Sequence, residues 1–150
     1  MSIERFQLLR CYMNKQEFDS IILKYSFTKA ADIARDNGLP KFTNLSFNDA
    51  KGYVYLWVEI DKDSLTIVYV GKAGKTLKER CAQHASGFKS SATGKKHAKR
   101  FEEGFQRGYR YALYARKSEF MCLLDEHEIP SECIEELVFI KKLSPTWNFG

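Results

Sequence analysis

The feature that most constrains the fold is a pair of β-rich segments joined by a short polar turn. Residues 52–60 have the sequence GYVYLWVEI and residues 65–71 have LTIVYVG, so both are rich in β-branched and aromatic side chains. The four residues between them, DKDS, are typical of a turn. The pattern predicts an antiparallel hairpin with strands at 52–60 and 64–70, in which Tyr53, Tyr55 and Trp57 share one face.

The segments after the hairpin predict further helices and one more strand. Thr76 and Glu79 have the spacing of a capping box, which indicates a helix start. Pro145 ends the last helix before it. Helices are predicted at 76–85, 95–107, 117–127 and 131–143, with a mobile basic loop at 86–94 and a third strand at 109–116. We therefore expect an α+β fold with a three-stranded antiparallel sheet flanked by helices.

The region before residue 52 has a different character. Apolar residues recur at helical spacing over 2–25, for example Phe6, Leu9 and Ile21. Thr28 is suited to cap a second helix that stops at Asn37-Gly38. Residues 39–51 look like a connector. We expect residues 1–51 to form an N-terminal helical extension with its connector, and residues 52–150 to form the core domain.

Charge is distributed unevenly along the chain. The net charge is +5, but residues 72–116 carry twelve Lys and Arg against three Glu, and the remainder is net negative. A basic stretch in a nearly neutral protein indicates a polyanionic partner, although a solvated helix face gives the same pattern. The candidate nucleic-acid contacts are Lys75, Lys78, Lys89, Lys95, Lys96, Lys99 and Arg100.

The four cysteines are scattered and show no metal-binding spacing. The N-terminal residues lack an apolar signal core, and no apolar run approaches membrane-spanning length. We expect reduced, mostly buried thiols and a cytoplasmic protein with no membrane partner.

Several residues have side chains suited to phosphate chemistry. Tyr69 ends the second strand, and Gly71 and Lys72 follow it closely. Arg80 and His84 are four residues apart, so a helix presents them on one face. Arginine offers a planar fork of donors to a phosphate. Each feature alone also fits sheet packing or an exposed basic face.

Two glutamates, Glu135 and Glu136, open the apolar part of the final helix. A carboxylate that faces a basic cleft is suited to hold Mg²⁺, which keeps much of its shell as water and phosphate oxygens. Acidic residues in a first helical turn also complement the helix dipole.

In their order along the chain, these features resemble the GIY-YIG nuclease family. Tyr53-Val54-Tyr55 stands at the GIY position and Tyr69-Val70-Gly71 at the YIG position. The segment YVGKAGKTLKER matches the entry into the family's arginine helix, and Glu136 precedes Pro145 and Asn148 at the family's closing spacing. The resemblance covers residues 52–149 and is nearest to the compact members, the phage endonuclease II type and the single-domain restriction enzymes.

The resemblance implies a role for each site residue. Tyr55 positions or deprotonates the attacking water, and Lys72 lowers the cost of a nearby tyrosinate. Tyr69 holds the water or the phosphate, and Asn148 braces the site. Arg80 and His84 stabilise the phosphate in the transition state, and Glu136 is the metal ligand. Tyr53 lies on the same face as Tyr55, and Glu135 is adjacent to Glu136, so either could take its neighbour's role.

The implied activity is hydrolysis of phosphodiester bonds in DNA with one Mg²⁺ or Mn²⁺ ion, in restriction or phage defence. Double-strand cleavage is simplest with two active sites, so we expect a homo-oligomer, either a dimer or a tetramer. Two other functions are compatible with the sequence. One is a nucleic-acid-binding module that does not cleave, and the other is an RNase or toxin with a protein inhibitor.

Overall fold

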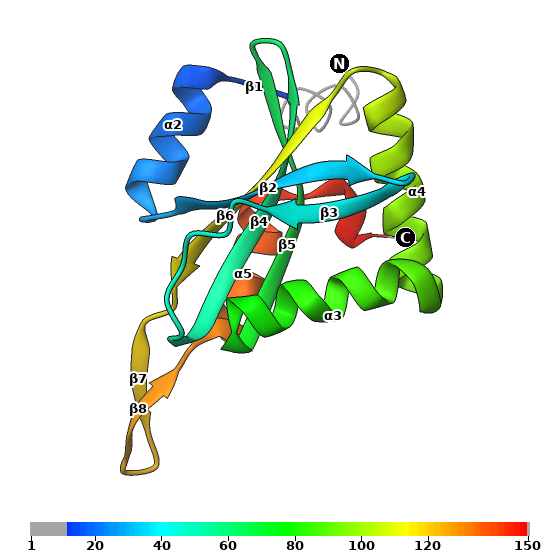
Figure 1. Cartoon of the computed structure of the whole chain (residues 1–150). Coiled ribbons are helices and arrows are strands. Elements are labelled where there is room, and N and C mark those ends of the chain that lie inside the picture. The colour runs from blue at the N-terminus through cyan, green and yellow to red at the C-terminus, as the bar shows by residue number, and fades with distance from the viewer. Residues whose placement is uncertain (1–11, 150) are drawn as a thin grey trace.

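The computed structural model describes residues 12–149, and six strands within this range form one antiparallel sheet (Figure 1). Its order is β1-β5-β4-β6-β2-β3. The strands of this sheet are β1 (Met13–Asn14), β2 (Thr28–Asp36), β3 (Leu39–Thr43), β4 (Lys51–Asp61), β5 (Ser64–Thr76) and β6 (Arg110–Lys117). The predicted α+β class and the three predicted strands, here β4, β5 and β6, are confirmed, and three further strands widen the sheet.

Helices cover both faces of the sheet. They are α2 (Lys15–Lys24), α3 (Leu77–Ser90), α4 (Ala92–Gln106) and α5 (Glu132–Leu143), followed by the short 3₁₀ helix η1 (Thr146–Asn148). On one face of β4, Tyr53, Tyr55 and Trp57 pack against α3 and α4. On the other face, Val54 and Leu56 pack against α2 and α5 (Figure 1). The predicted alternation along this strand is confirmed, and both of its faces are buried.

The prediction of a helix from Thr28 to Asn37 is wrong, because this segment is strand β2. It pairs with β6 on one side and β3 on the other, so sheet hydrogen bonds override a sequence of helix-compatible residues. Asn37 and Gly38 have φ angles of 51° and 76°, the left-handed conformation required by a two-residue hairpin turn. The Asn-Gly pair that was interpreted as a helix stop is therefore the turn between β2 and β3.

The connector predicted at 39–51 contains β3, which lies at the edge of the same sheet. Residues 28–43 thus share the core with the hairpin of β4 and β5. Of the predicted helix over 2–25, the structure confirms Lys15–Lys24 as α2. Residues 1–11, which include Phe6 and Leu9, lie outside the described range. The domain boundary at residue 52 stays a prediction.

The mobile basic loop predicted at 86–94 is wrong. Helix α3 continues to Ser90, and Ser91 is the N-cap of α4, with its hydroxyl accepting a hydrogen bond from the Gly94 amide at 2.9 Å. A side chain at Gly94 would overlap the backbone of Gly87, so the glycine at position 94 lets the two helices meet closely. The capping box at Thr76 is confirmed.

The helix predicted at 117–127 is also wrong, because this segment forms the hairpin of β7 (Phe120–Leu123) and β8 (Glu126–Pro130). Leu124 and Asp125 form its turn and have φ angles of 51° and 65°. The hairpin extends away from the rest of the molecule (Figure 1). Within residues 12–149, none of the helices combines the length and the apolar character that crossing a membrane requires.

Candidate active site

The two strand tyrosines meet where β4 and β5 pair. Tyr55 lies directly opposite Gly71, and a side chain at Gly71 would overlap the Tyr55 ring. Glycine is therefore required here because the aromatic ring occupies the space of a side chain. The centroids of the Tyr55 and Tyr69 rings are 6.2 Å apart. Tyr55 is fully buried, whereas Tyr69 is partly exposed.

Arg80 and His84 extend from α3 to the hydroxyl of Tyr55. The Arg80 Nε donates to the Tyr55 oxygen at 3.2 Å, and the same oxygen lies 2.5 Å from His84 Nε2. Burial lowers the pKa of His84 to about 3, with smaller contributions from Arg80 and His97. Burial raises the pKa of Tyr55 well above its ordinary value. A protonated tyrosine therefore donates to a neutral imidazole, and the helix prediction that placed Arg80 and His84 on one face is confirmed.

A polar pocket lies beside this cluster. Glu136 of α5, Arg80 of α3 and Lys72 of β5 all line it, and its volume is about 380 Å³. Partial burial raises the pKa of the Glu136 carboxyl, and Lys72 and Arg80 oppose that effect. Among the described residues, Glu136 forms no hydrogen bond or ion pair. Its carboxylate is thus available to a cation or a ligand.

Glu135 has a different environment from its neighbour. It pairs with Arg116 at 2.9 Å, and its other oxygen accepts hydrogen bonds from Ser131 Oγ at 2.6 Å and from the Glu119 amide at 2.8 Å. Both of its oxygens are therefore engaged, and only Glu136 lines the pocket. The structure places these two glutamates on different sides of α5.

Tyr53 also differs from Tyr55, although both lie on the same face of β4. The Tyr53 hydroxyl donates to Asn48 Oδ1 at 2.6 Å. Tyr55 is the strand tyrosine that contacts Arg80 and His84.

Lys72 and Asn148 occupy positions around this cluster. The Lys72 ammonium donates to Cys133 Sγ at 3.2 Å. Burial raises the pKa of Tyr69, and the positive charge of Arg80 opposes that effect. The expected support of a tyrosinate by Lys72 stays a prediction. Asn148 accepts from the Val70 amide and donates to the Val70 carbonyl, both at 2.9 Å. It holds the middle of β5 through both hydrogen-bonding groups of the Val70 backbone, as a neighbouring strand would.

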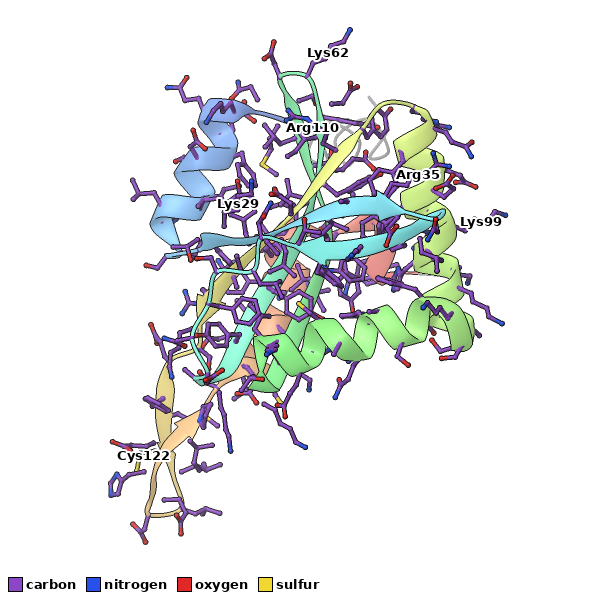
Figure 2. All side chains as sticks on the ribbon, in the orientation of Figure 1. Lys29, Arg35, Lys62, Lys99, Arg110 and Cys122 are labelled. Carbon is purple, nitrogen blue, oxygen red and sulfur yellow. The ribbon has the colours of Figure 1, made fainter. Side chains whose placement is uncertain are left out.

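The predicted nucleic-acid contacts do not form one continuous row. Lys75 lines the pocket with Glu136, while Lys78 and Lys89 line a hollow between α3 and β3. On α4, Lys95 and Lys99 lie toward β3, and Lys99 points outward (Figure 2). Lys96 and Arg100 lie on another side of the same helix, beside Trp147 and Asn148.

Sequence reasoning missed several residues that contact the site. Gln83 accepts from Arg80 Nη1 at 3.0 Å, and its position three residues along the helix was a usable signal. His97 and Trp147 lie beside Tyr69 and Trp57, but their separation in sequence gave no indication of this contact. Cys122 and Cys133 are exposed, so the expectation of mostly buried thiols is wrong for these two.

The side chains that could act as metal ligands indicate which kind of metal site is possible. Within residues 12–149, no three His, Cys, Asp or Glu side chains lie close enough together to form a metal cage. A single carboxylate that faces an open, polar pocket fits Mg²⁺, whose remaining ligands are commonly water and phosphate oxygens. The residues present are compatible with such an ion.

Known proteins share the family and the fold of this chain. The model of the GIY-YIG catalytic domain matches residues 51–147. The fold is similar to that of bacteriophage T4 EndoII, with a TM-score of 0.64 and 25% identity over 87% of this chain and 98% of that protein. The restriction endonuclease HPY188I, solved in complex with product DNA, is less similar, with a TM-score of 0.46 and 14% identity. That alignment covers 88% of this chain and 82% of HPY188I. No curated protein sequence matches significantly.

Proposed function

Because this chain belongs to the GIY-YIG nuclease family, we propose that it is an endonuclease that hydrolyses phosphodiester bonds in DNA with the help of one divalent cation. The observation that supports this most is the convergence of side chains from separate elements. Tyr55, Tyr69, Arg80 and His84 form one cluster, and it borders the pocket that Glu136 and Lys72 line. The similarity to T4 EndoII over nearly its whole length is consistent with this activity.

In this proposal Glu136 holds the cation, Mg²⁺ or Mn²⁺. The bound ion supplies Lewis-acid stabilisation of the phosphate and lowers the pKa of a water. Lys72 and Arg80 line the same pocket and attract the phosphate directly.

Arg80 has the position of a transition-state donor. Its Nε is held by Tyr55 and its Nη1 by Gln83, so the guanidinium is oriented before substrate binds. When water attacks phosphorus and the bond to the leaving oxygen breaks, charge on the phosphate oxygens increases. A preorganised cation stabilises that charge without further rearrangement.

The two tyrosines have different parts in this mechanism. Tyr55 is enclosed and orients Arg80 and His84 through its hydroxyl, so it acts through these neighbours. Tyr69 is partly exposed, and both Arg80 and Glu136 influence its pKa. It is the tyrosine suited to hold the attacking water or a phosphate oxygen.

The experiment is incubation with supercoiled plasmid, with and without Mg²⁺, for the native protein and for Glu136→Ala. The proposal predicts nicked or linear DNA only for the native protein with metal. If the native protein binds DNA but does not cleave it, with or without Mg²⁺, the chain is a binding module. Cleavage of RNA but not of the plasmid would favour the RNase alternative.

A role in restriction or phage defence, in the cytoplasm, belongs to the same proposal. It predicts that the enzyme cleaves unmodified plasmid. Plasmid prepared in the native host should resist this cleavage. Equal cleavage of the two preparations would contradict a restriction role and leave the nuclease activity intact.

We further propose that two copies of the chain associate through the β7–β8 hairpin and the outer face of α5. Phe120, Leu123 and Leu124 on the hairpin are more than half exposed, and so are Ile134 and Leu137 on α5.

Residues 118–130 contain four acidic residues and no Lys or Arg, whereas the net charge of the whole chain is +5. This segment would be repelled by DNA, so its exposed apolar side chains are suited to contact a second copy away from the nucleic acid. Light scattering that shows a dimer for the native protein and a monomer for Leu124→Glu would support the assignment, and a monomeric native protein would contradict it.

A further inference from the structure

Lys72 of β5 and Glu136 of α5 line the same pocket, yet they form no ion pair with each other. Among residues 12–149, the Lys72 ammonium pairs with no carboxylate, and its hydrogen bond is to Cys133 Sγ at 3.2 Å. Opposite charges that share a partly enclosed pocket attract each other. The contact with Cys133 therefore competes with the attraction of Lys72 to Glu136.

Cys133 is placed to exchange with Glu136 as the partner of this ammonium. The two residues are three positions apart on α5, so their side chains are neighbours on one side of the helix. Lys72 lies over this side, because it contacts Cys133 and its charge acts on the Glu136 carboxyl, whose pKa it lowers. The lysine stem is flexible, so a change of rotamer is sufficient to move the ammonium from one partner to the other.

Glu132 adds a second negative charge next to Lys72. It precedes Glu136 by four residues, so both carboxylates lie on the same side of α5. Its Oε2 is buried and has no hydrogen-bond partner within the described range. The contact with Cys133 is the largest influence on the raised pKa of Lys72, and the charges of Glu136 and Glu132 act in the same direction. Lys72 is thus a charged ammonium with two carboxylates nearby and a thiol as its hydrogen-bond partner.

The proposed reaction requires Lys72 and Glu136 to stay apart. A cation at Glu136 is coordinated by a carboxylate oxygen. An ammonium bonded to that carboxylate would cover the oxygen and repel the cation. The same ammonium would then have fewer donors for the phosphate.

We propose that Cys133 is a positioning residue that holds Lys72 away from Glu136. The carboxylate thus stays open to the cation, and the ammonium keeps its remaining donors for a phosphate oxygen. Sulfur is a weak hydrogen-bond acceptor, so the contact directs the ammonium without fixing it. This inference rests on the proposed function and adds a residue that acts through Lys72.

The test measures cation binding in the absence of DNA. Mn²⁺ is added to the protein, and the free ion is followed by electron paramagnetic resonance. Cys133→Ala should weaken binding by about 3- to 10-fold, the effect of one ordinary hydrogen bond, because Lys72 then pairs with Glu136. Cys133→Ser keeps an acceptor and should restore most of the affinity. A melting curve for every variant shows that each is folded.

The part played by Lys72 is isolated by a second pair of variants. Lys72→Met removes the ammonium, so it should strengthen Mn²⁺ binding. In the Lys72→Met background, Cys133→Ala should have no further effect. The matched control is Cys122→Ala, which also removes an exposed thiol but lies on β7, in the hairpin that extends away from the pocket (Figure 2). It should leave Mn²⁺ binding unchanged.

Plasmid cleavage provides an independent measurement. Cys133→Ala should need about 3- to 10-fold more Mg²⁺ for half of its maximal rate, the same factor as in Mn²⁺ binding. The rate at saturating Mg²⁺ should change less, because a high cation concentration displaces Lys72 from Glu136. A reduced maximal rate with an unchanged Mg²⁺ requirement would overturn the inference.

The outcomes distinguish the inference from its premise. If Cys133→Ala binds Mn²⁺ as tightly as the native protein, or loses the same affinity after Lys72→Met, the inference is overturned and the proposed function stands. If the native protein and Glu136→Gln bind Mn²⁺ equally, Glu136 is not the cation ligand. The proposed function and the inference would then both fail.

Discussion

Two regions of this molecule each contain an arginine and a glutamate, and they differ in whether the glutamate forms hydrogen bonds and an ion pair. Arg116 and Glu135 are paired, nearly buried, and surrounded by further hydrogen bonds from Ser131 and from the Glu119 amide. Arg80 and Glu136 share a pocket, and Glu136 has no hydrogen bond or ion pair among the described residues. Both glutamates lie on α5, one residue apart. The closed region stabilises the fold, whereas the open one leaves charge available for substrate and cation.

The largest expected difference between the two regions is in cleavage. Glu136→Gln keeps the shape of the side chain but removes the charge that a cation needs, so cleavage should be lost while DNA binding persists. Glu135→Gln should retain cleavage at temperatures where the protein is folded. Plasmid cleavage and anisotropy measure the two properties separately. The opposite result, with Glu135→Gln inactive and Glu136→Gln active, would exchange the roles of the two residues.

Replacement of the two arginines should affect different measurements. Arg80→Ala should reduce the cleavage rate by roughly 10²–10³-fold, the usual effect of losing a preorganised transition-state donor. Its effect on affinity should be smaller, because the charge it stabilises develops during the reaction. Single-turnover rates and binding constants provide the comparison. A loss confined to affinity would show that Arg80 is only a phosphate anchor.

Arg116→Ala should instead lower stability. It leaves Glu135 without its cation and removes the hydrogen bond at 2.8 Å to the Tyr25 carbonyl. Breaking a buried pair on one side costs about 3 kcal/mol, which corresponds to roughly 6–12 °C in melting temperature for a chain of this size. Calorimetry or circular dichroism measures the shift. An unchanged melting temperature would show that the pair does not stabilise the fold.

The smallest expected effect is a pH dependence that originates in the open region. The folded-state pKa of His84 is about 3, against an ordinary value of 6.5, so between these values the unfolded chain binds a proton that the folded chain does not. The free energy of unfolding should therefore fall as pH falls through this window. The contribution from His84 is about 2 kcal/mol between pH 7 and pH 5. Urea unfolding at the two pH values should show a smaller difference for His84→Gln, and an equal difference would contradict the neutral state of His84.

Local patterns correctly predicted the part of the chain in which neighbours in sequence also pack together. The β4–β5 hairpin and the capping box at Thr76 depend on short-range pairing and side-chain type, so they could be recognised directly. The same holds for Arg80 and His84, which helical spacing places on one face of α3. The GIY-YIG resemblance was confirmed for the same reason, because its motifs lie on these elements in order.

Patterns failed where a distant partner decides the conformation. Residues 28–36 contain good helix formers, yet they form a strand because β6 and β3 offer hydrogen bonds on both sides. Residues 120–130 form a hairpin whose turn requires left-handed angles at Leu124 and Asp125, and Leu124 in particular gives no indication of this. Gly94 resembled a loop residue, but it allows α4 to approach the backbone of α3 at Gly87.

The sequence by itself determined the order of the chemical groups and the local elements that carry them, because those depend on residue type and on contacts a few positions apart. Only the tertiary structure decided that Glu136 and not Glu135 faces the pocket, and that Tyr55 and not Tyr53 contacts Arg80 and His84. Glu135 and Glu136, or Tyr53 and Tyr55, differ in surroundings and not in chemistry. Those surroundings are supplied by Arg116, Ser131, Asn48, Arg80 and His84, which are distant in sequence or on other elements. Their positions follow from packing of the whole sheet against its helices, which no local pattern encodes.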